Sequence, residues 1–325
     1  MQPILDVQRL RMYFFTEEGV VKAVDDVSIK VNEGDLLGVV GESGSGKSCF
    51  ALSVMKLIPR PGKILSGRVV FDGIDLTALG EEDMRKLRGS KLCMSFQDPK
   101  TFLNPIMRIG EQISEVLILH KGMTKQKARD EAIKTMELVG IPSAADRFMD
   151  YPHQLSGGMR QRCLIAMAIC CDPKFLIADE PTTALDVITQ HQILELLKDL
   201  KKRLKCTIML ITHDLGIVAE ICEKVVVMYA GKFVEYADVR TVLRNPSHPY
   251  TMGLTKSMPR ADEDIVKLEA ISGWIPDMIN PPSGCRFHPR CAYAQKICFE
   301  REPELRSVRS EEHLAACHIL PFEKT

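Results

Sequence analysis

A run of small residues directly follows an apolar stretch near the N-terminus. "LLGVV" at 36–40 consists of strand-forming residues, and "GESGSGKS" at 41–48 comes straight after it. Phosphate oxygens need several short N–H donors that converge on them, and glycine lets the backbone curl closely enough to supply these donors. The run also precedes a predicted helix, whose N-terminus attracts anions. The sequence therefore predicts a nucleotide-phosphate site formed largely by backbone amides.

The same run fits the pattern G-x-x-x-x-G-K-[ST]. In this pattern the lysine brings a positive charge to the outer phosphates, and the hydroxyl of the last residue suits Mg²⁺. The predicted nucleotide contacts in this loop are Gly41, Ser43, Gly44, Ser45, Gly46, Lys47, Ser48 and Cys49.

Two adjacent carboxylates end a second apolar strand, "FLIADEP" at 175–181. Because Asp179 and Glu180 are neighbours, their side chains point in different directions at the strand end. One can face a Mg²⁺ ion while the other orients an attacking water molecule, which is the arrangement that hydrolysis needs. Solvated carboxylates also cap strands, but the phosphate loop earlier in the chain favours the catalytic interpretation.

A third stretch, "YPHQLSGGMRQR" at 151–162, predicts a second anion site. Ser156 is a good N-cap for the helix that follows, and Gly157 and Gly158 expose backbone amides at its start. One chain thus offers two phosphate sites, although its own nucleotide needs only the first.

At these residues the sequence resembles the ATP-binding cassette (ABC) transporter ATPases, because LSGGM resembles their signature motif. In that family the signature of one subunit closes over the ATP that the phosphate loop of another subunit holds. Gln97 in "SFQDP" resembles the glutamine that senses Mg²⁺ and the transmembrane partner. Asp186 in "TTALD" resembles the aspartate of the dimer interface, and His213 in "LITHD" resembles the histidine at the γ-phosphate. Phe14 resembles the aromatic residue that stacks on adenine, with Tyr13 as the alternative.

The resemblance thus implies three sets of site residues. The implied catalytic residues are Glu180, His213 and Lys47. The implied Mg²⁺ residues are Ser48, Gln97 and Asp179. The residues implied to contact the ATP of a second subunit are Ser156, Gly157, Gly158 and Asp186.

The resemblance is closer to one group of these ATPases. "QDPKTFLNP", "YPHQLSGGM", "ADEPTTALDV" and "NPSHPYTMGL" resemble the ATPase subunits of dipeptide and oligopeptide importers, and nickel importers belong to the same group. Some members of the group hold a [4Fe-4S] cluster in a C-terminal extension with four cysteines. Residues 102–104, beside Gln97, correspond to the border of the groove that docks a permease helix.

The cysteines of this chain fall into two groups. Seven of the eleven are scattered through apolar runs and are expected to be small buried residues, whereas the last four are Cys285, Cys291, Cys298 and Cys317. Four thiolates can bind Zn²⁺ or an iron–sulfur cluster, and His288 and His318 are further candidate zinc ligands. We expect Arg286, Arg290 and Lys296 to offset the negative charge of either site. The residues leave the metal open, and the family resemblance favours the [4Fe-4S] cluster over zinc.

The elements around these motifs predict an α/β fold. Strands are predicted at 4–14, 21–31, 36–40, 66–72, 91–96, 174–178, 206–212 and 224–231, and a helix follows the phosphate loop from Lys47 to about Leu57. Strands that alternate with helices favour a largely parallel sheet. The resemblance implies a P-loop NTPase with a RecA-like core, an antiparallel β subdomain and a helical subdomain inserted at about 100–165. We expect an ATP-binding domain at 1–245 and a small Cys-rich extension at 246–325.

Composition narrows the class of partner. Lys+Arg and Asp+Glu both number 43, so the formal net charge is zero and no basic footprint for nucleic acid is apparent. No apolar run approaches the ~20 residues of a membrane span, and the N-terminus does not resemble a signal peptide. We therefore expect a cytosolic protein, and the resemblance to transporter ATPases implies a peripheral position at the cytoplasmic face of the cell membrane.

The resemblance implies that the chain is the ATP-hydrolysing subunit of a peptide importer. Its implied partners are a second ABC ATPase, in a homo- or heterodimer, two transmembrane permease subunits and, indirectly, a peptide-binding protein. A nickel importer ATPase is one alternative. The other is a soluble ABC ATPase that acts on DNA or ribosomes, but such proteins usually carry coiled coils, a second cassette or a basic face, which the sequence lacks.

Overall fold

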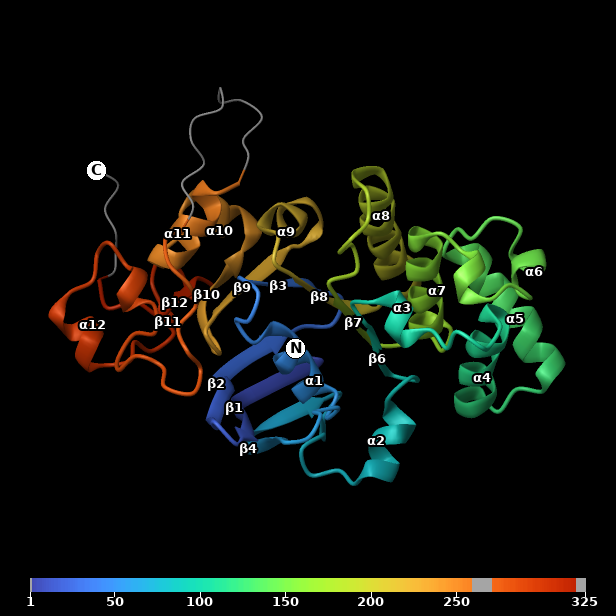
Figure 1. The fold of residues 1–325 in the computed structure, drawn as a ribbon, viewed down its shortest axis with the longest axis horizontal. Helices are drawn as coiled ribbons and strands as arrows, with labels where there is room; N and C mark the ends of the chain where they lie inside the picture. The colour runs from blue at the N-terminus through green and yellow to red at the C-terminus, as the bar shows by residue number, and fades with distance from the viewer. Residues whose placement is uncertain (1, 259–270, 320–325) are drawn as a thin grey trace. The chain divides into compact units, whose positions relative to one another are not determined.

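The computed structural model describes residues 2–258 and 271–319. They form two compact units, which are treated separately below (Figure 1). Unit 1 contains residues 1–77 and 211–325, and unit 2 contains residues 78–210. The predicted boundary at 245/246 does not coincide with a boundary between these units, and it stays a prediction.

Unit 1 contains an antiparallel sheet with the strand order β2-β1-β4-β5. Its long hairpin runs from Leu5↔Val31 to Thr16↔Gly19, and three irregularities shift its register. Alternate apolar residues of these strands are buried, which is the pattern of a half-buried sheet. The strands are β1 (Leu5–Thr16), β2 (Gly19–Val31), β4 (Gly62–Phe71) and β5 (Ile74–Asp75).

A second set of strands in unit 1 has the order β11-β12-β10-β9-β3. The members are β3 (Leu36–Val40), β9 (Lys224–Tyr229), β10 (Lys232–Asp238), β11 (Arg306–Ser307) and β12 (Leu314–Ala315). β3 and β9 are parallel, and β12 pairs antiparallel with β10. The C-terminal extension therefore adds two short strands to this sheet. The helices of unit 1 are α1 (Lys47–Val54), α9 (Leu215–Ile221), α10 (Val239–Arg244), α11 (Pro249–Lys256), the 3₁₀ helix η2 (His288–Arg290) and α12 (Lys296–Glu300).

Unit 2 combines a group of helices with the strand order β8-β7-β6. β6 (Leu92–Ser95) and β7 (Phe175–Asp179) are parallel and fully buried. β8 (Thr207–Thr212) ends across the boundary between the units. The helices are α2 (Glu81–Leu87), α3 (Pro99–Phe102), α4 (Ile109–Lys121), α5 (Lys125–Leu138), α6 (Ala144–Arg147), η1 (Pro152–Gln154), α7 (Gly157–Ile169) and α8 (Val187–Leu204).

α8 illustrates how local sequence forms these elements. Asp186 caps its first turn, and basic residues in its last turn suit the negative end of the helix dipole. Its apolar residues recur at helical spacing and are buried at Ile193, Leu194, Leu197 and Leu200. A helix at this position in the chain was predicted from the same spacing.

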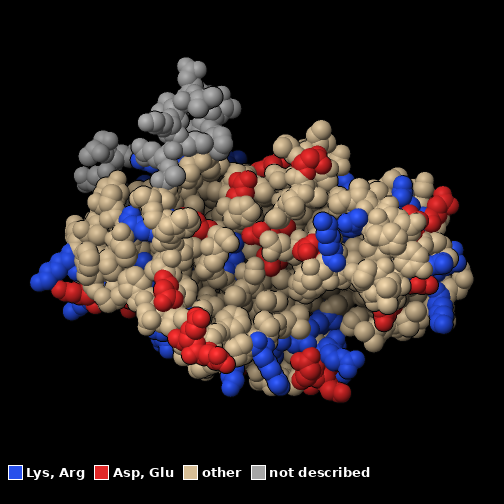
Figure 2. All heavy atoms as spheres, in the orientation of Figure 1, with Lys and Arg blue, Asp and Glu red and all other residues tan. Residues whose placement is uncertain are grey.

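The predicted strands agree with the observed ones to within a few residues. The helix after the phosphate loop ends at Val54 instead of about Leu57, because Lys56 adopts a left-handed backbone conformation with φ 51°. Of the seven scattered cysteines, five are buried, and Cys49 and Cys222 are half-buried. Within the described residues, every helix is too short or too polar to cross a bilayer. Both signs of charge occur across the face in Figure 2, in keeping with the zero formal net charge.

Candidate nucleotide site and Cys-rich extension

The phosphate loop in unit 1 joins the buried strand β3 to helix α1. Two of its glycines have no room for a side chain: a Cβ at Gly41 would lie 2.1 Å from the carbonyl oxygen of Met228, and one at Gly46 would lie 2.3 Å from that of Ala23. Gly46 also has φ 106°, which other residues rarely adopt. The sequence therefore folds into a tight loop because only glycine fits these positions.

Lys47 lies inside this loop with 5% of its surface exposed. Its Nζ donates to the carbonyl oxygens of Gly41, at 2.7 Å, and Glu42, at 2.9 Å. The hydroxyl of Ser45 is fully buried and has no hydrogen-bond partner among the described residues. A buried polar group without a partner is costly, so this hydroxyl favours a polar ligand in the loop.

In unit 2, the two parallel strands β6 and β7 bring Gln97 and Glu180 together. Their register pairs Ser95 with Ala178, and the two polar residues lie two positions beyond this pair. Gln97 Nε2 donates to Glu180 Oε2 at 2.8 Å, and Thr183 Oγ1 donates to the same oxygen at 2.9 Å. Asp179, at the end of β7, is buried, whereas Glu180 is half-buried with φ 44°. The two carboxylates thus have different environments.

The predicted signature and the predicted interface aspartate also lie close together in unit 2. Ser156 caps α7 and accepts a hydrogen bond from Met159 N at 3.3 Å. A Cβ at Gly158 would lie 2.5 Å from Thr189 Cγ2, and Asp186 accepts hydrogen bonds from the backbone N–H and the hydroxyl of Thr189. These hydrogen bonds hold the pKa of Asp186 below its ordinary value.

This part of unit 2 is open to solvent. Ser156, Gly157 and Asp186 are exposed, and the apolar residues Val187 and Ile188 are 81% and 73% exposed. Exposed large apolar side chains beside a polar motif are typical of a surface that contacts another protein. Here the surface carries both motifs that the resemblance assigns to contact with a second subunit.

His213 belongs to unit 1 and follows the last residue of β8. It is exposed, and the next residue, Asp214, caps α9 by accepting a hydrogen bond from Gly216 N at 2.7 Å. The strand end and the helix start therefore fix the backbone on both sides of this histidine.

The two aromatic candidates for adenine stacking have different environments on β1. The hydroxyl of Tyr13 donates to Asp25 Oδ1 at 2.6 Å, and this internal hydrogen bond fixes the position of the ring. Burial and this hydrogen bond raise the pKa of Tyr13. Phe14 is half-buried next to Gly62, where a Cβ would lie 2.8 Å from its ring. The structure thus favours Phe14 among the two alternatives.

The four cysteines of the extension come together. Cys285, Cys291, Cys298 and Cys317 line one small cavity with Phe287, His288 and His318. Burial raises the pKa of Cys285 to about 12 and that of Cys317 to about 11. His288 Nδ1 and His318 Nε2 each hydrogen-bond a backbone carbonyl oxygen. Among the described residues, no three of the four sulfur atoms lie within 4.8 Å of one another.

The expectation for two of the nearby cations was wrong. Arg286 pairs with Asp25, and Arg290 pairs with Glu42, so these charges are neutralised by carboxylates of unit 1 instead of offsetting a metal site. Lys296 is 91% exposed and pairs with Glu300. The sequence did not reveal the partners because they lie more than 240 residues away along the chain.

Two further residues at these sites were not predicted from the sequence. Thr183 donates to Glu180, and Tyr250 Oη accepts from Glu42 N at 2.8 Å. Thr183 belongs to the quoted motif "ADEPTTALDV", which was a usable signal. Tyr250 offered no local signal because its contact depends on the tertiary fold. The predicted groove residue Leu103 is buried, whereas Phe102 and Asn104 are exposed.

The sequence matches two family models. Residues 24–183 match "ABC transporter", and residues 234–298 match "Oligopeptide/dipeptide transporter, C-terminal region". The first match contains the phosphate loop and the signature, and the second contains Cys285, Cys291 and Cys298.

Individual proteins are similar over nearly the whole chain. Oligopeptide transport ATP-binding protein AppD of Bacillus subtilis (strain 168) is 49% identical over 311 residues, which are 95% of each chain. Oligopeptide transport ATP-binding protein OppD of Salmonella typhimurium is 48% identical over 300 residues, which are 92% of this chain and 89% of that protein. Among solved structures, the dimeric post-hydrolysis state of the ATP-binding cassette MJ0796 bound to ADP and Pi has a TM-score of 0.66 and 27% identity, covering 73% of this chain and 99% of that one. The chain therefore belongs to the ABC transporter ATPases, in the group that carries the oligopeptide/dipeptide transporter C-terminal region.

Proposed function

We propose that this ABC ATPase hydrolyses ATP to drive the import of di- and oligopeptides through separate permease subunits. The observation that carries the ATPase part is the phosphate loop, with its two obligatory glycines and the buried hydroxyl of Ser45. The peptide part rests on the oligopeptide transport proteins that are 48–49% identical over most of the chain.

The loop residues from Gly41 to Cys49 would hold the phosphates of ATP, and Phe14 would stack on adenine. ATP binding would turn the Lys47 ammonium group from the backbone carbonyls toward the outer phosphates, where it would form charge-assisted hydrogen bonds. Ser48, Gln97 and Asp179 would hold the Mg²⁺ ion, which neutralises phosphate charge when it is bound.

Glu180 would act as the general base that orients the attacking water, and His213 would contact the γ-phosphate. The hydrogen bonds from Gln97 and Thr183 support this role, because they fix the position of one carboxylate oxygen. No large movement of the carboxylate is then needed at the moment of reaction.

A second ABC ATPase would complete the site. The signature residues Ser156, Gly157 and Gly158 would close over the partner's ATP, and Asp186 would cross the interface. Two permease subunits would dock near Gln97, where Phe102 is 46% and Ile106 is 86% exposed. The protein would then be peripheral, at the cytoplasmic face of the membrane, and a peptide-binding protein would act with the complex indirectly.

The four cysteines of the extension would hold a [4Fe-4S] cluster. Their sulfur atoms line one cavity, and four thiolates can bind the four irons of such a cluster. The bound group would cross-link an extension that has little core of its own. We also propose the domain division at 245/246, with the metal site in 246–325.

The importer role is tested by capture of the tagged chain from detergent-solubilised membranes. Two permease subunits and a second ATPase should copurify with it, and cells that lack the chain should lose uptake of a labelled oligopeptide. Copurification of ribosomes or nucleic acid without any permease would contradict the proposal. Uptake of peptide that persists while uptake of Ni²⁺ is lost would identify the nickel alternative.

The cluster is tested by anaerobic purification. Brown protein that contains iron and acid-labile sulfide is expected, and serine at Cys298 should abolish both. Colourless protein with one zinc per chain would contradict the cluster and support a zinc site formed by the same cysteines.

A further inference from the structure

One short segment of the extension contacts unit 1 on both sides of the phosphate loop. "CRFHPRC" at 285–291 begins and ends with cysteines of the proposed metal site, and it contains Arg286 and Arg290. Phe287, in its centre, packs against Tyr229 and Tyr250, with ring centroids 5.2 and 5.5 Å away. The segment is therefore part of the core of unit 1.

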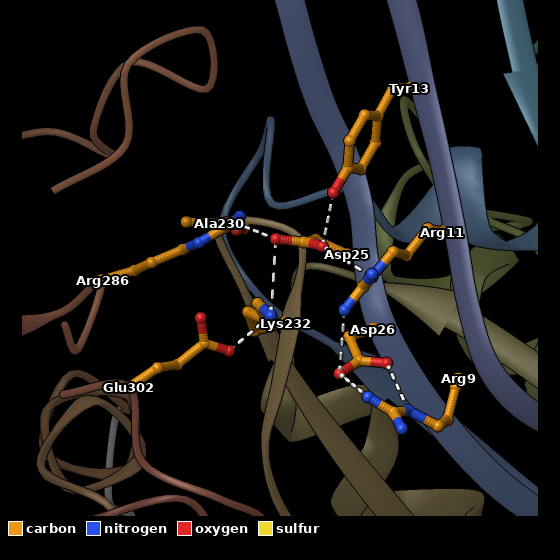
Figure 3. A network of polar contacts seen from close by, with 9 residues as sticks. All are labelled: Arg9, Arg11, Tyr13, Asp25, Asp26, Ala230, Lys232, Arg286 and Glu302. Atoms are coloured by element: carbon orange, nitrogen blue, oxygen red, sulfur yellow. Dashed lines mark hydrogen bonds and ion pairs between the residues drawn. The ribbon is translucent and has the colours of Figure 1, made fainter. Parts of the chain in front are cut away.

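The first contact is the polar network around Asp25 in Figure 3. Arg286 donates to the Asp25 carboxylate and to the backbone oxygen of Ala230, and Lys232 lies 3.4 Å from the same carboxylate. Next to Ala230, Gly231 N donates to the backbone oxygen of Ser45 at 2.8 Å. Arg286 therefore supports the turn that holds one side of the phosphate loop.

The second contact reaches the loop directly. Arg290 Nη1 and Nη2 donate to the two carboxylate oxygens of Glu42 at 2.8 and 3.0 Å, which is the bidentate geometry of a strong ion pair. Only 6% of the Arg290 side chain and 28% of the Glu42 side chain are exposed. Arg290 is fixed in turn by the backbone oxygens of Ile271 and Ser272. Water thus screens this pair far less than it screens a surface pair.

Glu42 is the second residue of the phosphate loop, and each of its polar groups is engaged. Its N–H donates to Tyr250 Oη, its carbonyl oxygen accepts from Lys47 Nζ, and its carboxylate binds Arg290. The carboxylate is a negative charge on a loop that must bind phosphate, and it belongs to a residue that already contacts Lys47. Without Arg290 it would repel phosphate and compete for the lysine.

We propose that Arg290 is a positioning residue for ATP binding. It neutralises Glu42 and binds both of its carboxylate oxygens, so that this carboxylate does not compete with phosphate for Lys47 and the loop amides keep their orientation. The C-terminal extension thereby sets the ATP affinity of the catalytic loop. The inference rests on the proposed ATP site. Its test must therefore distinguish a wrong role for Arg290 from a wrong ATP site.

The test is a double-mutant cycle that measures the dissociation constant of ATP by calorimetry on the full chain. R290Q should weaken ATP binding about tenfold, in the range of ordinary coupling between residues. Adding E42Q to R290Q should restore most of this loss, because the freed carboxylate is then absent. E42Q alone supplies the fourth corner of the cycle. In hydrolysis, KM should follow the dissociation constant more closely than kcat does.

A matched control is the exposed pair Lys296–Glu300 on α12, and K296Q/E300Q should leave ATP affinity unchanged. If R290Q does not fold, R290K keeps the charge but loses the bidentate geometry, and its smaller loss should also be rescued by E42Q. Equal weakening in R290Q and in R290Q/E42Q would mean damage to the fold and would overturn the proposal. The proposal would also be overturned if R290Q bound ATP with wild-type affinity while K47A bound ATP more weakly. Wild-type affinity in K47A itself would instead overturn the ATP site.

Discussion

The functional residues of unit 1 are built differently from those of unit 2. In unit 1, part of the phosphate loop is buried: Lys47 and Ser45 are enclosed, and a Cβ at Gly41 or Gly46 would collide with backbone, whereas Ser43 and Gly44 are exposed. In unit 2, Ser156, Gly157 and Asp186 are exposed, and the half-buried Glu180 accepts hydrogen bonds from Gln97 and Thr183. With the function proposed above, we expect one chain to suffice for ATP binding and hydrolysis to require a second subunit.

The largest effect that would test this comparison is expected at Glu180. E180Q should lower turnover by about 10²–10⁴-fold, because an amide cannot take the proton of the attacking water. ATP affinity, measured by calorimetry, should stay within about twofold of wild type. The amide oxygen of the variant can still accept from Gln97 and Thr183, so the geometry is retained. Turnover near the wild-type rate would remove Glu180 from the role of base.

The second prediction separates binding from assembly. S156R should lower turnover by about 100-fold, because a long side chain would occupy the space for the γ-phosphate of the partner's ATP. Binding of ATP to the monomer should be unchanged, since Ser156 is exposed and lies in unit 2. ATP-dependent dimerisation of the E180Q/S156R variant, followed by light scattering, should be lost relative to E180Q. A normal dimer would show that this surface does not contact a second subunit.

The third prediction concerns binding alone. K47A should weaken ATP affinity by about 10- to 100-fold, because a charge-assisted hydrogen bond to phosphate is worth ~1.5–3 kcal/mol. Calorimetry on the monomer is the measurement. S156A is the matched control, because it removes a hydroxyl from the other anion site. If S156A weakens monomer binding as much as K47A does, the division between the two sites is wrong.

The phosphate loop and the signature were predictable because their constraints are local. A glycine at Gly46 is favoured by its own backbone, which has φ 106°, and the serine cap at Ser156 acts within one helical turn. The order of strands and helices was predictable for the same reason, since hydrophobic periodicity is read within a short window. The gathering of the four cysteines followed from their crowding at the end of the chain.

The features that were not predictable depend on tertiary contacts. Glu42 and Arg290 are 248 positions apart, and Asp25 and Arg286 are 261 apart, so no local pattern joins them. The choice between Tyr13 and Phe14 was ambiguous because irregular register near Met12 breaks the simple alternation of faces along β1. A spacing of cysteines likewise gives a candidate ligand set but does not identify the metal.

The smallest effect is expected at Asp25, which belongs to unit 1 and should affect that unit only. Burial alone would raise the pKa of this carboxylate, but the Tyr13 hydroxyl and the charges of Lys232 and Arg286 outweigh it and keep the pKa below its ordinary value. D25N should therefore lower the free energy of unfolding by about 3 kcal/mol at pH 7, because it removes the carboxylate partner of the largely buried Arg286 and one of the two carboxylate partners of Lys232. Urea denaturation measures this loss.

The depressed pKa of Asp25 determines how the stability difference between wild type and D25N changes with pH. A carboxylate whose pKa is depressed by folding contributes stability above its unfolded pKa, about 3.9, and this contribution disappears as the pH falls through the lower folded value. The difference between wild type and D25N should therefore be constant near neutral pH and shrink below about pH 4. Hydrogen exchange should show faster opening in residues 19–31 and 224–238 of unit 1, with α4 and α5 of unit 2 unchanged, because the network around Asp25 lies within unit 1. An equal increase of hydrogen exchange in both units would mean that they unfold together. The difference between the two units in the burial of their functional residues would then have no counterpart in their stability.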